Sequence, residues 1–248
     1  MTITKDGDAL IFIDDKTIHK YDIKSNQWVQ EYTMSWTHFP FSGGAVTDLD
    51  TGLIYGIDSL DGIGESPELD LDTNMSWKFT EFNPVDKSFT FVEKRGRPGS
   101  MMFVSMVYSS AAKRIFGYED GVFDNDQTGL WSYDIKSKDW TQVKVTGQIP
   151  PTRSSPCFVS AYGGQKLILA GGQHTKKTGL FQDIYSFDVS TLAWTKLPDM
   201  PLAVLGQSCA VSVDSFIYLG GYKQASAIGK ELANDDGPIV LNLASNTW

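Results

Sequence analysis

The stretch YDIKSNQW (21–28) returns almost unchanged as YDIKSKDW (133–140), and looser copies of it recur along the chain. In each copy an aromatic residue or leucine precedes Asp or Asn, and six residues after that Asp or Asn comes Trp or Phe. The other copies are FNPVDKSF (82–89), FDVSTLAW (187–194) and LNLASNTW (241–248). Successive Asp or Asn positions lie 61, 51, 54 and 54 residues apart. A regular period of this length indicates a repeat architecture in which each period is one structural unit.

Each octapeptide has the pattern of a hairpin between two strands. In the fourth copy the extended run IYSFD (184–188) ends at Asp188, which begins a short polar run. Such a run favours a turn because short polar side chains bond nearby backbone groups. Trp194 then starts the next strand, WTKL.

Two further extended runs precede each octapeptide except the first. In the fourth unit they are CFVSAYG (157–163) and KLILAGG (166–172). Four short strands per period predict one blade of a β-propeller. The corresponding runs in the other units are GGAVTDLD (43–50) with LIYGID (53–58), MFVSMVYS (102–109) with RIFGYE (114–119), and SCAVSVD (208–214) with SFIYLGG (215–221).

On these features the sequence resembles the kelch-repeat β-propeller family, within the galactose-oxidase-like propeller superfamily. The residues that carry the resemblance are Gly171–Gly172 with Tyr185 and Trp194, and Gly220–Gly221 with Trp248. The resemblance covers essentially the whole chain. It implies an all-β single domain over 1–248, built of four-stranded antiparallel blades. About five blades are encoded, with repeat units of approximately 1–37, 38–97, 98–148, 149–200 and 201–248.

The stretch 153–221 is most similar to kelch propellers of early-diverging filamentous fungi. Such fungal proteins are commonly secreted or membrane-anchored. The resemblance therefore implies an extracellular or membrane-anchored location for the full-length protein. The N-terminal sequence MTITKDGDALIFI lacks the pattern of a signal peptide, and no run of eighteen apolar residues is present to span a membrane.

The two ends bear on how many blades the native ring holds. The first unit has the strands ALIFID, TIHKYD and WVQEYT, with no innermost strand expected before them, and the last unit stops at Trp248. Because kelch rings usually hold six or seven blades, we expect the chain to be a fragment of such a ring. The alternative is a complete five-bladed ring with a three-stranded closing blade, for which a cytoplasmic location is expected.

The net charge of −9 bears on the class of partner. Affinity for nucleic acid comes from Lys and Arg that neutralise phosphates, so an acidic chain is a poor candidate for a nucleic-acid-binding protein. The same balance argues against binding to anionic membrane surfaces. We therefore expect a protein, peptide or glycan as the ligand; nothing in the sequence indicates the oligomeric state.

The two cysteines occupy equivalent positions in successive innermost strands. Cys157 and Cys209 can form a disulfide if their Cα atoms lie within about 7 Å. The alternative is a pair of buried free thiols that act as small apolar side chains. A disulfide would favour an oxidising compartment, and the sequon at Asn74 is compatible with secretion.

Within a blade, the loop after the second strand and the link to the next blade lie at the same end of the strands. Function in repeat folds tends to reside on one such loop face. Arg and aromatic side chains are frequent binding anchors, and Arg can grip a carboxylate with two hydrogen bonds. For each candidate the alternative is a structural or solvated loop residue. The candidates on this face are Trp36, His38, Arg95, Arg97, Arg153, His174, Lys176, Tyr222 and Lys223.

The 61-residue step contains the acidic run DSLDGIGESPELDLDTN (58–74). Clustered carboxylates can bind Ca²⁺, but the run lacks the glycine and terminal Glu of a known calcium loop. We therefore interpret it as a solvated insertion and expect no metal site.

An enzymatic function is the remaining alternative. The copper oxidase chemistry of the superfamily uses two Tyr and two His ligands with a Cys joined to one Tyr, and this chain has only His19, His38 and His174. No Ser/His/Asp signature or phosphate-binding loop is present. We therefore predict a non-catalytic binding module without a cofactor. The alternatives are an intracellular kelch adaptor or scaffold and a galactose-oxidase-like carbohydrate-active enzyme.

Overall fold

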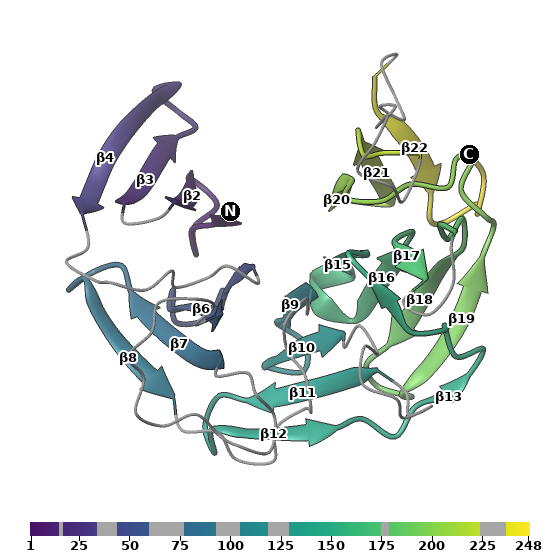
Figure 1. The fold of residues 1–248 in the computed structure, drawn as a ribbon, viewed down its shortest axis with the longest axis horizontal. Coiled ribbons are helices and arrows are strands. Elements are labelled where there is room, and N and C mark those ends of the chain that lie inside the picture. The colour runs from purple at the N-terminus through teal and green to yellow at the C-terminus, as the bar shows by residue number, and fades with distance from the viewer. Residues whose placement is uncertain are drawn as a thin grey trace. The chain divides into compact units, whose positions relative to one another are not determined.

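The computed structural model describes residues 1–14, 17–33, 44–59, 77–92, 105–118, 129–174, 179–223 and 237–248. The chain divides into two compact units, residues 1–97 with 136–139 and residues 98–135 with 140–248. Apart from one short 3₁₀ turn, the regular structure of the described residues is β-strand (Figure 1). The prediction of an all-β fold made of antiparallel blades is confirmed; the single-domain boundaries stay a prediction.

The first unit holds two four-stranded sheets. Strand order follows chain order in both, so each sheet is a simple meander. The first sheet has β1 (Thr2–Ile3), β2 (Ala9–Asp14), β3 (Thr17–Asp22) and β4 (Gln27–Thr33). The second has β5 (Ala45–Thr47), β6 (Ile54–Ser59), β7 (Trp77–Asn83) and β8 (Ser88–Val92).

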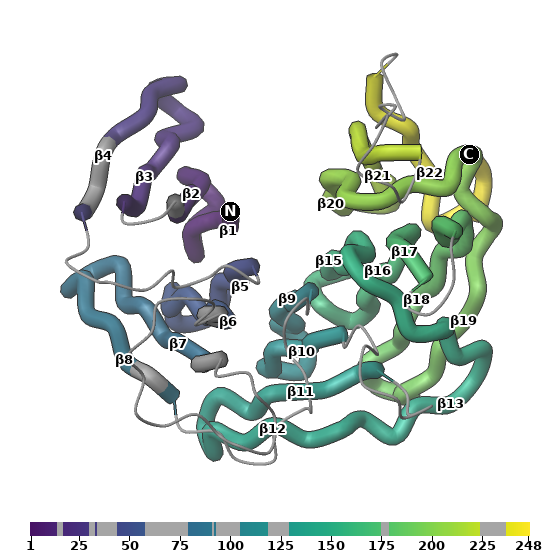
Figure 2. The backbone as a smooth tube through the Cα atoms, viewed as in Figure 1, coloured from purple at the N-terminus to yellow at the C-terminus, as the bar shows by residue number. Residues whose placement is uncertain are grey.

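The expectation that the first repeat unit (1–37) has no innermost strand was wrong. The two residues of β1 pair with β2, with Thr2 opposite Ile11 and Ile3 opposite Leu10, and they complete the sheet. Figure 2 labels this short strand beside β2. Two residues are too few to show an alternating apolar pattern, so a strand as short as β1 cannot be predicted from periodicity.

The second unit holds three further sheets, which we call the third, fourth and fifth. The third has β9 (Ser105–Ser109), β10 (Arg114–Tyr118), β11 (Leu130–Asp134) and β12 (Asp139–Gln142). The fourth has β15 (Cys157–Ala161), β16 (Lys166–Ala170), β18 (Ile184–Asp188) and β19 (Ala193–Leu197), to whose edge β13 (Thr146–Gly147) adds in parallel. The described strands of the fifth are β20 (Ser208–Ser212), β21 (Ser215–Leu219) and β22 (Ile239–Asn242).

Both faces of the fourth sheet are apolar, because successive apolar side chains along its strands point to opposite faces. Leu167, Leu169 and Phe187 pack against the third sheet, in a core that includes Phe116 and Trp194. The intervening residues, such as Ile168 and Ala170, pack against the fifth sheet. Side chains of a strand point alternately to opposite faces, which is why an almost continuous apolar run such as KLILA fits a sheet buried on both sides.

The repeated octapeptide is the hairpin between the third and fourth strands of the first four sheets, and in the fifth sheet it is the turn after β22. Its Asp or Asn caps the turn: Asp188 Oδ1 accepts hydrogen bonds from the backbone N–H groups of Ser190 and Thr191, both at 3.0 Å. The sixth residue has a positive φ of 55° to 64° in all five copies: Asn26, Lys87, Lys138, Leu192 and Asn246. The sequence is repeated because the same turn is built five times.

The Trp that closes the octapeptide differs in burial from one sheet to the next. Trp140 and Trp194 are buried, whereas Trp28 is 60% exposed and Trp248 is 38% exposed. The ring of Trp248 still meets Tyr218 edge to face at 5.9 Å. The role of this position is therefore structural in the third and fourth sheets: Trp194 packs in the core that the two sheets share, and Trp140 contacts Tyr133 of its own sheet.

Candidate functional site

The candidate site residues divide into those that the structure describes and those outside the described residues. Trp36, His38, Arg95, Arg97 and Lys176 belong to the second group, and their ligand contacts stay a prediction. Most of the acidic run 58–74 is also outside the described residues. Among the residues that are described, no group of three or more His, Cys, Asp or Glu is placed to hold a metal ion.

Arg153 is fully buried and fastens the fourth sheet to the segment that leads into it. Its guanidinium forms a bidentate ion pair with the Asp183 carboxylate, with N–O distances of 2.5 and 3.2 Å. It also donates to the carbonyl oxygens of Pro151 and Gly171, both at 3.1 Å. The ring of Phe181 lies 4.1 Å from the guanidinium carbon. The structure thus places Arg153 in the interior, with no exposed group for a ligand carboxylate.

Two tyrosines complete this buried polar cluster. The hydroxyl of Tyr185 donates to Asp183 at 3.1 Å, and that of Tyr118 donates to the Pro151 carbonyl at 3.0 Å. Burial, with the neighbouring Asp183 carboxylate, raises the pKa of Tyr185 to about 12. Burial also raises the pKa of Tyr118. Both phenols therefore stay neutral donors at physiological pH and act as structural groups.

Next to this cluster, backbone hydrogen bonds join several loop segments into one surface. The short strands β14 (Arg153–Ser154) and β17 (Gln173–His174) pair, and Gln173 forms a second bridge to Leu180. The N–H of Gly172 donates to Val204 O at 3.0 Å. Leu205 and Tyr222 then exchange two backbone hydrogen bonds, at 3.1 and 2.9 Å. We call residues 153–154, 172–174, 179–181, 204–205 and 221–223 the loop ledge.

The double glycine of the fourth unit makes this close approach possible. Gly172 has φ of 93°, and a Cβ on it would lie 2.7 Å from the carbonyl oxygen of Ser154. Only glycine fits such a position without displacing the backbone. The glycines that identify the repeat therefore also hold the loop ledge together.

Three of the predicted contact residues lie on the loop ledge. His174 is half-buried, with its ring centroid 3.8 Å from that of Phe181. Tyr222 is half-buried and Lys223 is exposed. A histidine, a phenol and an ammonium on a pre-organised backbone can donate hydrogen bonds and stack on an aromatic ring, which suits an extended peptide or a glycan.

Cys157 and Cys209 are joined as a disulfide, with their Cα atoms 6.1 Å apart. It links β15 to β20, the innermost strands of the fourth and fifth sheets. Together with the bridge between Leu205 and Tyr222, it fixes the position of the fifth sheet beside the fourth.

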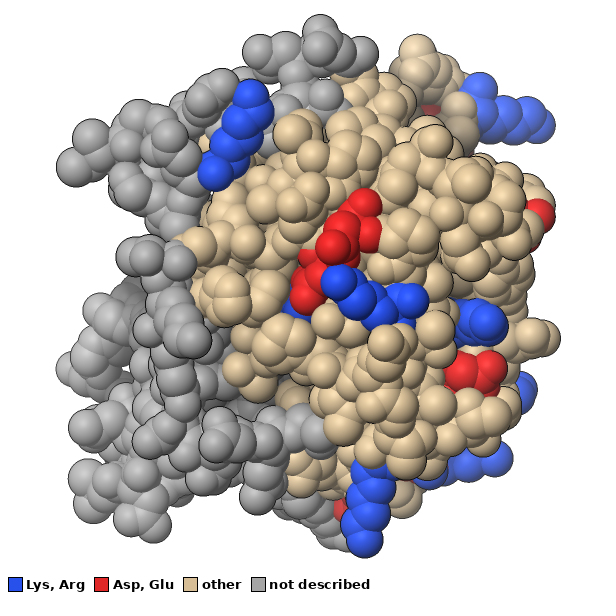
Figure 3. Space-filling model, turned by 90° about the vertical axis from the view of Figure 1, so that its right-hand side faces the viewer, with Lys and Arg blue, Asp and Glu red and all other residues tan. Residues whose placement is uncertain are grey.

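The surface of the molecule carries mixed charge. In the part of the face that Figure 3 shows in colour, acidic and basic side chains meet near the centre and single charges are otherwise separated by uncharged residues. Lys196 and Asp199 form an exposed ion pair at 2.8 Å. In the described part of the chain, no helix has the length and apolar character needed to cross a bilayer.

Sequence reasoning identified the loop face but missed how it is held together. Asp183, Phe181 and the pairing of β14 with β17 were not predicted, although they position His174. The sequence shows Asp183 only as a carboxylate between the double glycine and the strand IYSFD. That position alone does not indicate an ion pair. The ion pair of Asp183 with Arg153 spans 30 residues, a separation that periodicity does not reveal.

Comparison with known proteins agrees with this geometry. The model of the KLHDC2/KLHL20/DRC7 Kelch-repeats domain matches residues 105–248, more than half of the chain. Mouse Kelch domain-containing protein 1 is 32% identical over 108 residues, which are 40% of this chain and 25% of that protein. The human protein of the same name is 32% identical over 106 residues, with the same coverage.

An enzyme is also among the relatives. The N-(sulfonatooxy)prop-2-enimidothioate sulfolyase of Thlaspi arvense is 27% identical over 122 residues, which are 44% of this chain and 35% of the enzyme. The matched stretches thus span a quarter to about a third of the length of these curated relatives.

Proposed function

Because the chain belongs to the KLHDC2/KLHL20/DRC7 kelch-repeats domain family, we propose that it is a non-catalytic interaction module that binds a protein segment on the loop ledge. Kelch domains generally act as protein-interaction modules. The observation that carries the proposal is the continuous set of backbone hydrogen bonds from β14 through β17 and Leu205 to Tyr222. A surface that is ordered before binding loses little conformational entropy when a ligand docks.

The chemistry of the loop ledge favours an extended peptide as the ligand. Lys223 offers an exposed cation for a carboxylate, and His174 and Tyr222 offer ring faces with polar edges. A glycan is the alternative ligand of the same face. The ledge comprises loops on the rigid fourth and fifth sheets, a common arrangement for binding sites in repeat folds.

The test is selection of a displayed library of linear peptides on the wild-type protein, followed by affinity measurements on purified variants. We expect selected peptides to bind His174→Ala, Tyr222→Ala and Lys223→Ala at least about tenfold more weakly. Lys24→Ala removes an exposed charge in a hairpin turn of the first sheet and should bind like wild type. If all three ledge variants keep wild-type affinity, the proposed face is wrong.

We also propose that the Cys157–Cys209 disulfide forms in the cell and that the protein works in an oxidising compartment, as a secreted or membrane-anchored propeller. Support comes from the pairing of the two cysteines across adjacent innermost strands. The alternative is an intracellular adaptor with free thiols. Rapid alkylation in the native cells, followed by mass spectrometry without reduction, separates the two: labelled Cys157 and Cys209 would favour the adaptor.

The enzymatic alternative has a direct assay. The relative from Thlaspi arvense is named for cleavage of an N-sulfonatooxy-enimidothioate. Incubation of this protein with that substrate should release no product above the uncatalysed background if the module only binds. Product release that depends on intact protein would replace the binding proposal.

A further inference from the structure

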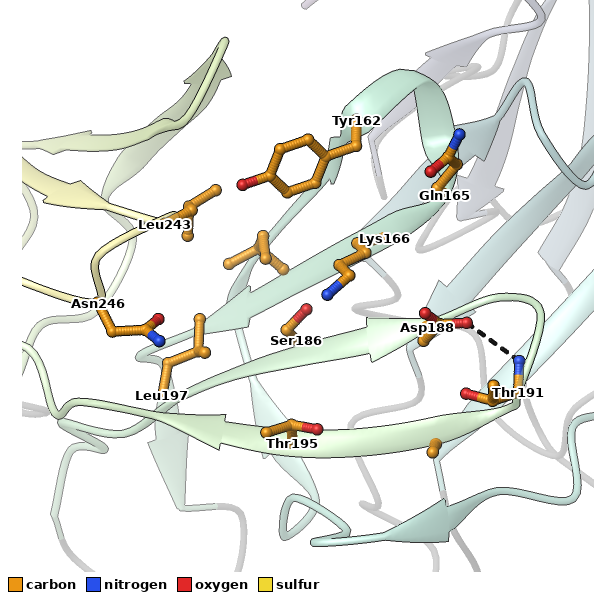
Figure 4. Close-up of a pocket in the computed structure, with 12 residues that line it drawn as sticks. Tyr162, Gln165, Lys166, Ser186, Asp188, Thr191, Thr195, Leu197, Leu243 and Asn246 are labelled. Carbon is orange, nitrogen blue, oxygen red and sulfur yellow. Dashed lines mark hydrogen bonds between the residues drawn. The ribbon is translucent and has the colours of Figure 1, made fainter.

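A groove of about 570 Å³ runs along the fourth sheet, from the turn after Asp188 to Leu197. Its floor is formed by Ile168 and Ser186, both buried. Figure 4 shows Tyr162 and Leu243 on one side, Thr195 and Leu197 on the other, and Lys166 with Ser186 between them. The volume is within the range of small-molecule sites, about 300–1,000 Å³.

Several polar groups that line this groove have no side-chain partner among the described residues. The hydroxyls of Ser186 and Thr195, the ammonium of Lys166 and the side-chain amide of Asn246 all border the groove. Among the described residues, none of these four side chains forms a hydrogen bond or an ion pair. Ser186 is buried, whereas Lys166, Thr195 and Asn246 are exposed at the rim of the groove. A hollow with several donors and acceptors on its lining can bind a polar ligand in place of water.

The third sheet shows that this arrangement departs from the internal repeat. Arg114 lies opposite Asp134 and Phe116 lies opposite Ser132, just as Lys166 lies opposite Asp188 and Ile168 lies opposite Ser186. In the third sheet, Arg114 pairs with Asp134 at 2.7 Å and reaches the hydroxyl of Ser132 at 3.4 Å.

In the fourth sheet, Oδ1 of Asp188 accepts hydrogen bonds from its own turn, from Ser190 and Thr191. In the third sheet, the side chains of Arg114, Asp134 and Ser132 therefore satisfy one another's hydrogen-bonding groups. In the fourth sheet, the corresponding positions leave a cation and a hydroxyl facing the groove.

The chemistry of the lining selects a neutral, hydroxyl-rich ligand. The groove borders one cation, Lys166, and one anion, Asp188, so it has no net charge to attract an ion. Hydroxyls and amides both donate and accept hydrogen bonds, which matches the hydroxyls of a sugar.

Tyr162 supplies an aromatic ring that is 37% exposed, against which the apolar face of a sugar ring can stack. Burial raises the pKa of the Tyr162 phenol, and the carboxylate of Asp214, in the turn between β20 and β21, lies near its hydroxyl and contributes to this rise in pKa. We propose that this groove binds a monosaccharide or disaccharide unit of a neutral glycan, independently of the loop ledge.

The test is saturation-transfer-difference NMR on the 248-residue protein with the methyl glycosides of glucose, galactose, mannose and N-acetylglucosamine. We expect transfer to at least one of these sugars, with affinity in the millimolar range (about 1 mM). Lys166→Met and Ser186→Ala should weaken that affinity about tenfold, as expected when a ligand loses one hydrogen bond to each group. Thr195→Trp fills the groove from its exposed rim and should abolish the transfer.

Lys144→Met removes an exposed ammonium elsewhere on the second unit and is the matched control, which should bind like wild type. Thermal unfolding of each variant shows whether it is folded. Transfer that is lost in folded groove variants and kept in the control supports the proposal. It is overturned if none of the four sugars shows transfer to the wild-type protein, or if transfer persists unchanged in the three groove variants.

Discussion

At the scale of the single residue, burial decides what an ion pair contributes, and the chain offers a matched pair for comparison. Arg153 and Asp183 are paired in the interior, with side-chain exposures of 0% and 15%. Arg114 and Asp134 form a similar pair with exposures of 37% and 30%. Removing one partner of a buried pair leaves an uncompensated charge, whereas an exposed pair is screened by water.

We therefore predict that Arg153→Met lowers the free energy of unfolding by about 3–5 kcal/mol, because the Asp183 carboxylate loses its cationic partner and keeps only the hydrogen bond from Tyr185. Arg114→Met, the control, should cost no more than about 1 kcal/mol. Urea denaturation of the two variants measures both values. Equal losses of unfolding free energy in the two variants would show that the buried contacts of Arg153 do not stabilise the fold more than an exposed ion pair does.

The same residue shows where prediction from sequence failed. Arg153 has the residue type of a binding anchor and lies in a link between units, so it was selected as a ligand contact. Its partner Asp183 is distant in sequence, and only the folded chain reveals that the guanidinium is already used. His174, Tyr222 and Lys223 lie in loop segments whose positions follow directly from the strand pattern, and their contact with a ligand stays a prediction.

At the scale of the element, the turns hold most of the local strain. Val213 has φ of 53° in the tight turn between β20 and β21, although it is β-branched and 83% exposed. A β-branched residue in the left-handed region is unfavourable by about 1–2 kcal/mol. The side chain gains little in return, since most of it faces solvent.

We predict that Val213→Gly raises the melting temperature, with a gain of about 1 kcal/mol in the free energy of unfolding. Val85 is the control, because it is an exposed turn valine (89%) that is not at positive φ. Val85→Gly should lower stability, since glycine adds freedom to the unfolded chain. Differential scanning calorimetry separates the two effects, and a loss of stability in Val213→Gly would contradict the assignment of strain.

The Asx turn of the fourth octapeptide predicts a specific acid response. The pKa of Asp188 is lowered to about 2, first by the hydroxyl of Ser190 and then by the N–H of Thr191, both of which stabilise the carboxylate. A folded-state pKa below the ordinary 3.8 means that this group stabilises the fold above that pH and that the contribution is lost as the pH falls toward about 2. Solvent screening keeps the contribution small because Asp188 lies near the surface.

Asp188→Asn keeps the acceptor oxygen, as Asn242 does in the fifth octapeptide at 2.8 and 3.0 Å. It has no proton to gain. We therefore expect this variant to lose less stability than wild type between about pH 4 and pH 2. Urea titrations at several pH values in this range test the difference, and identical pH slopes would mean that Asp188 does not titrate with a lowered pKa.

At the scale of the whole molecule, the repeat predicted the fold class because the period and the octapeptide are both imposed by the blade. It could not predict β1 or the pairing of β14 with β17, since two-residue strands have no periodic signature. The loop ledge was recognisable only as a face. Its continuity depends on contacts such as Gly172 with Val204, which join segments from different units of the repeat.

The disulfide should stabilise the second unit as a whole. It closes a loop of 52 residues, and restriction of the unfolded chain by such a loop is worth about 4 kcal/mol. We predict that a reducing agent lowers the urea midpoint of wild type and leaves that of Cys157→Ala/Cys209→Ala unchanged. If the reductant does not shift the wild-type midpoint, the disulfide does not contribute to stability.

The most direct test of the account is hydrogen–deuterium exchange of the protein with and without a peptide selected on it. We predict that the peptide slows exchange in segments 172–174, 204–205 and 221–223 of the loop ledge and leaves the hairpin turns at 188–192 and 242–247 unchanged. Slowed exchange confined to those hairpin turns would contradict the central claim, because it would place the peptide at the opposite end of the strands.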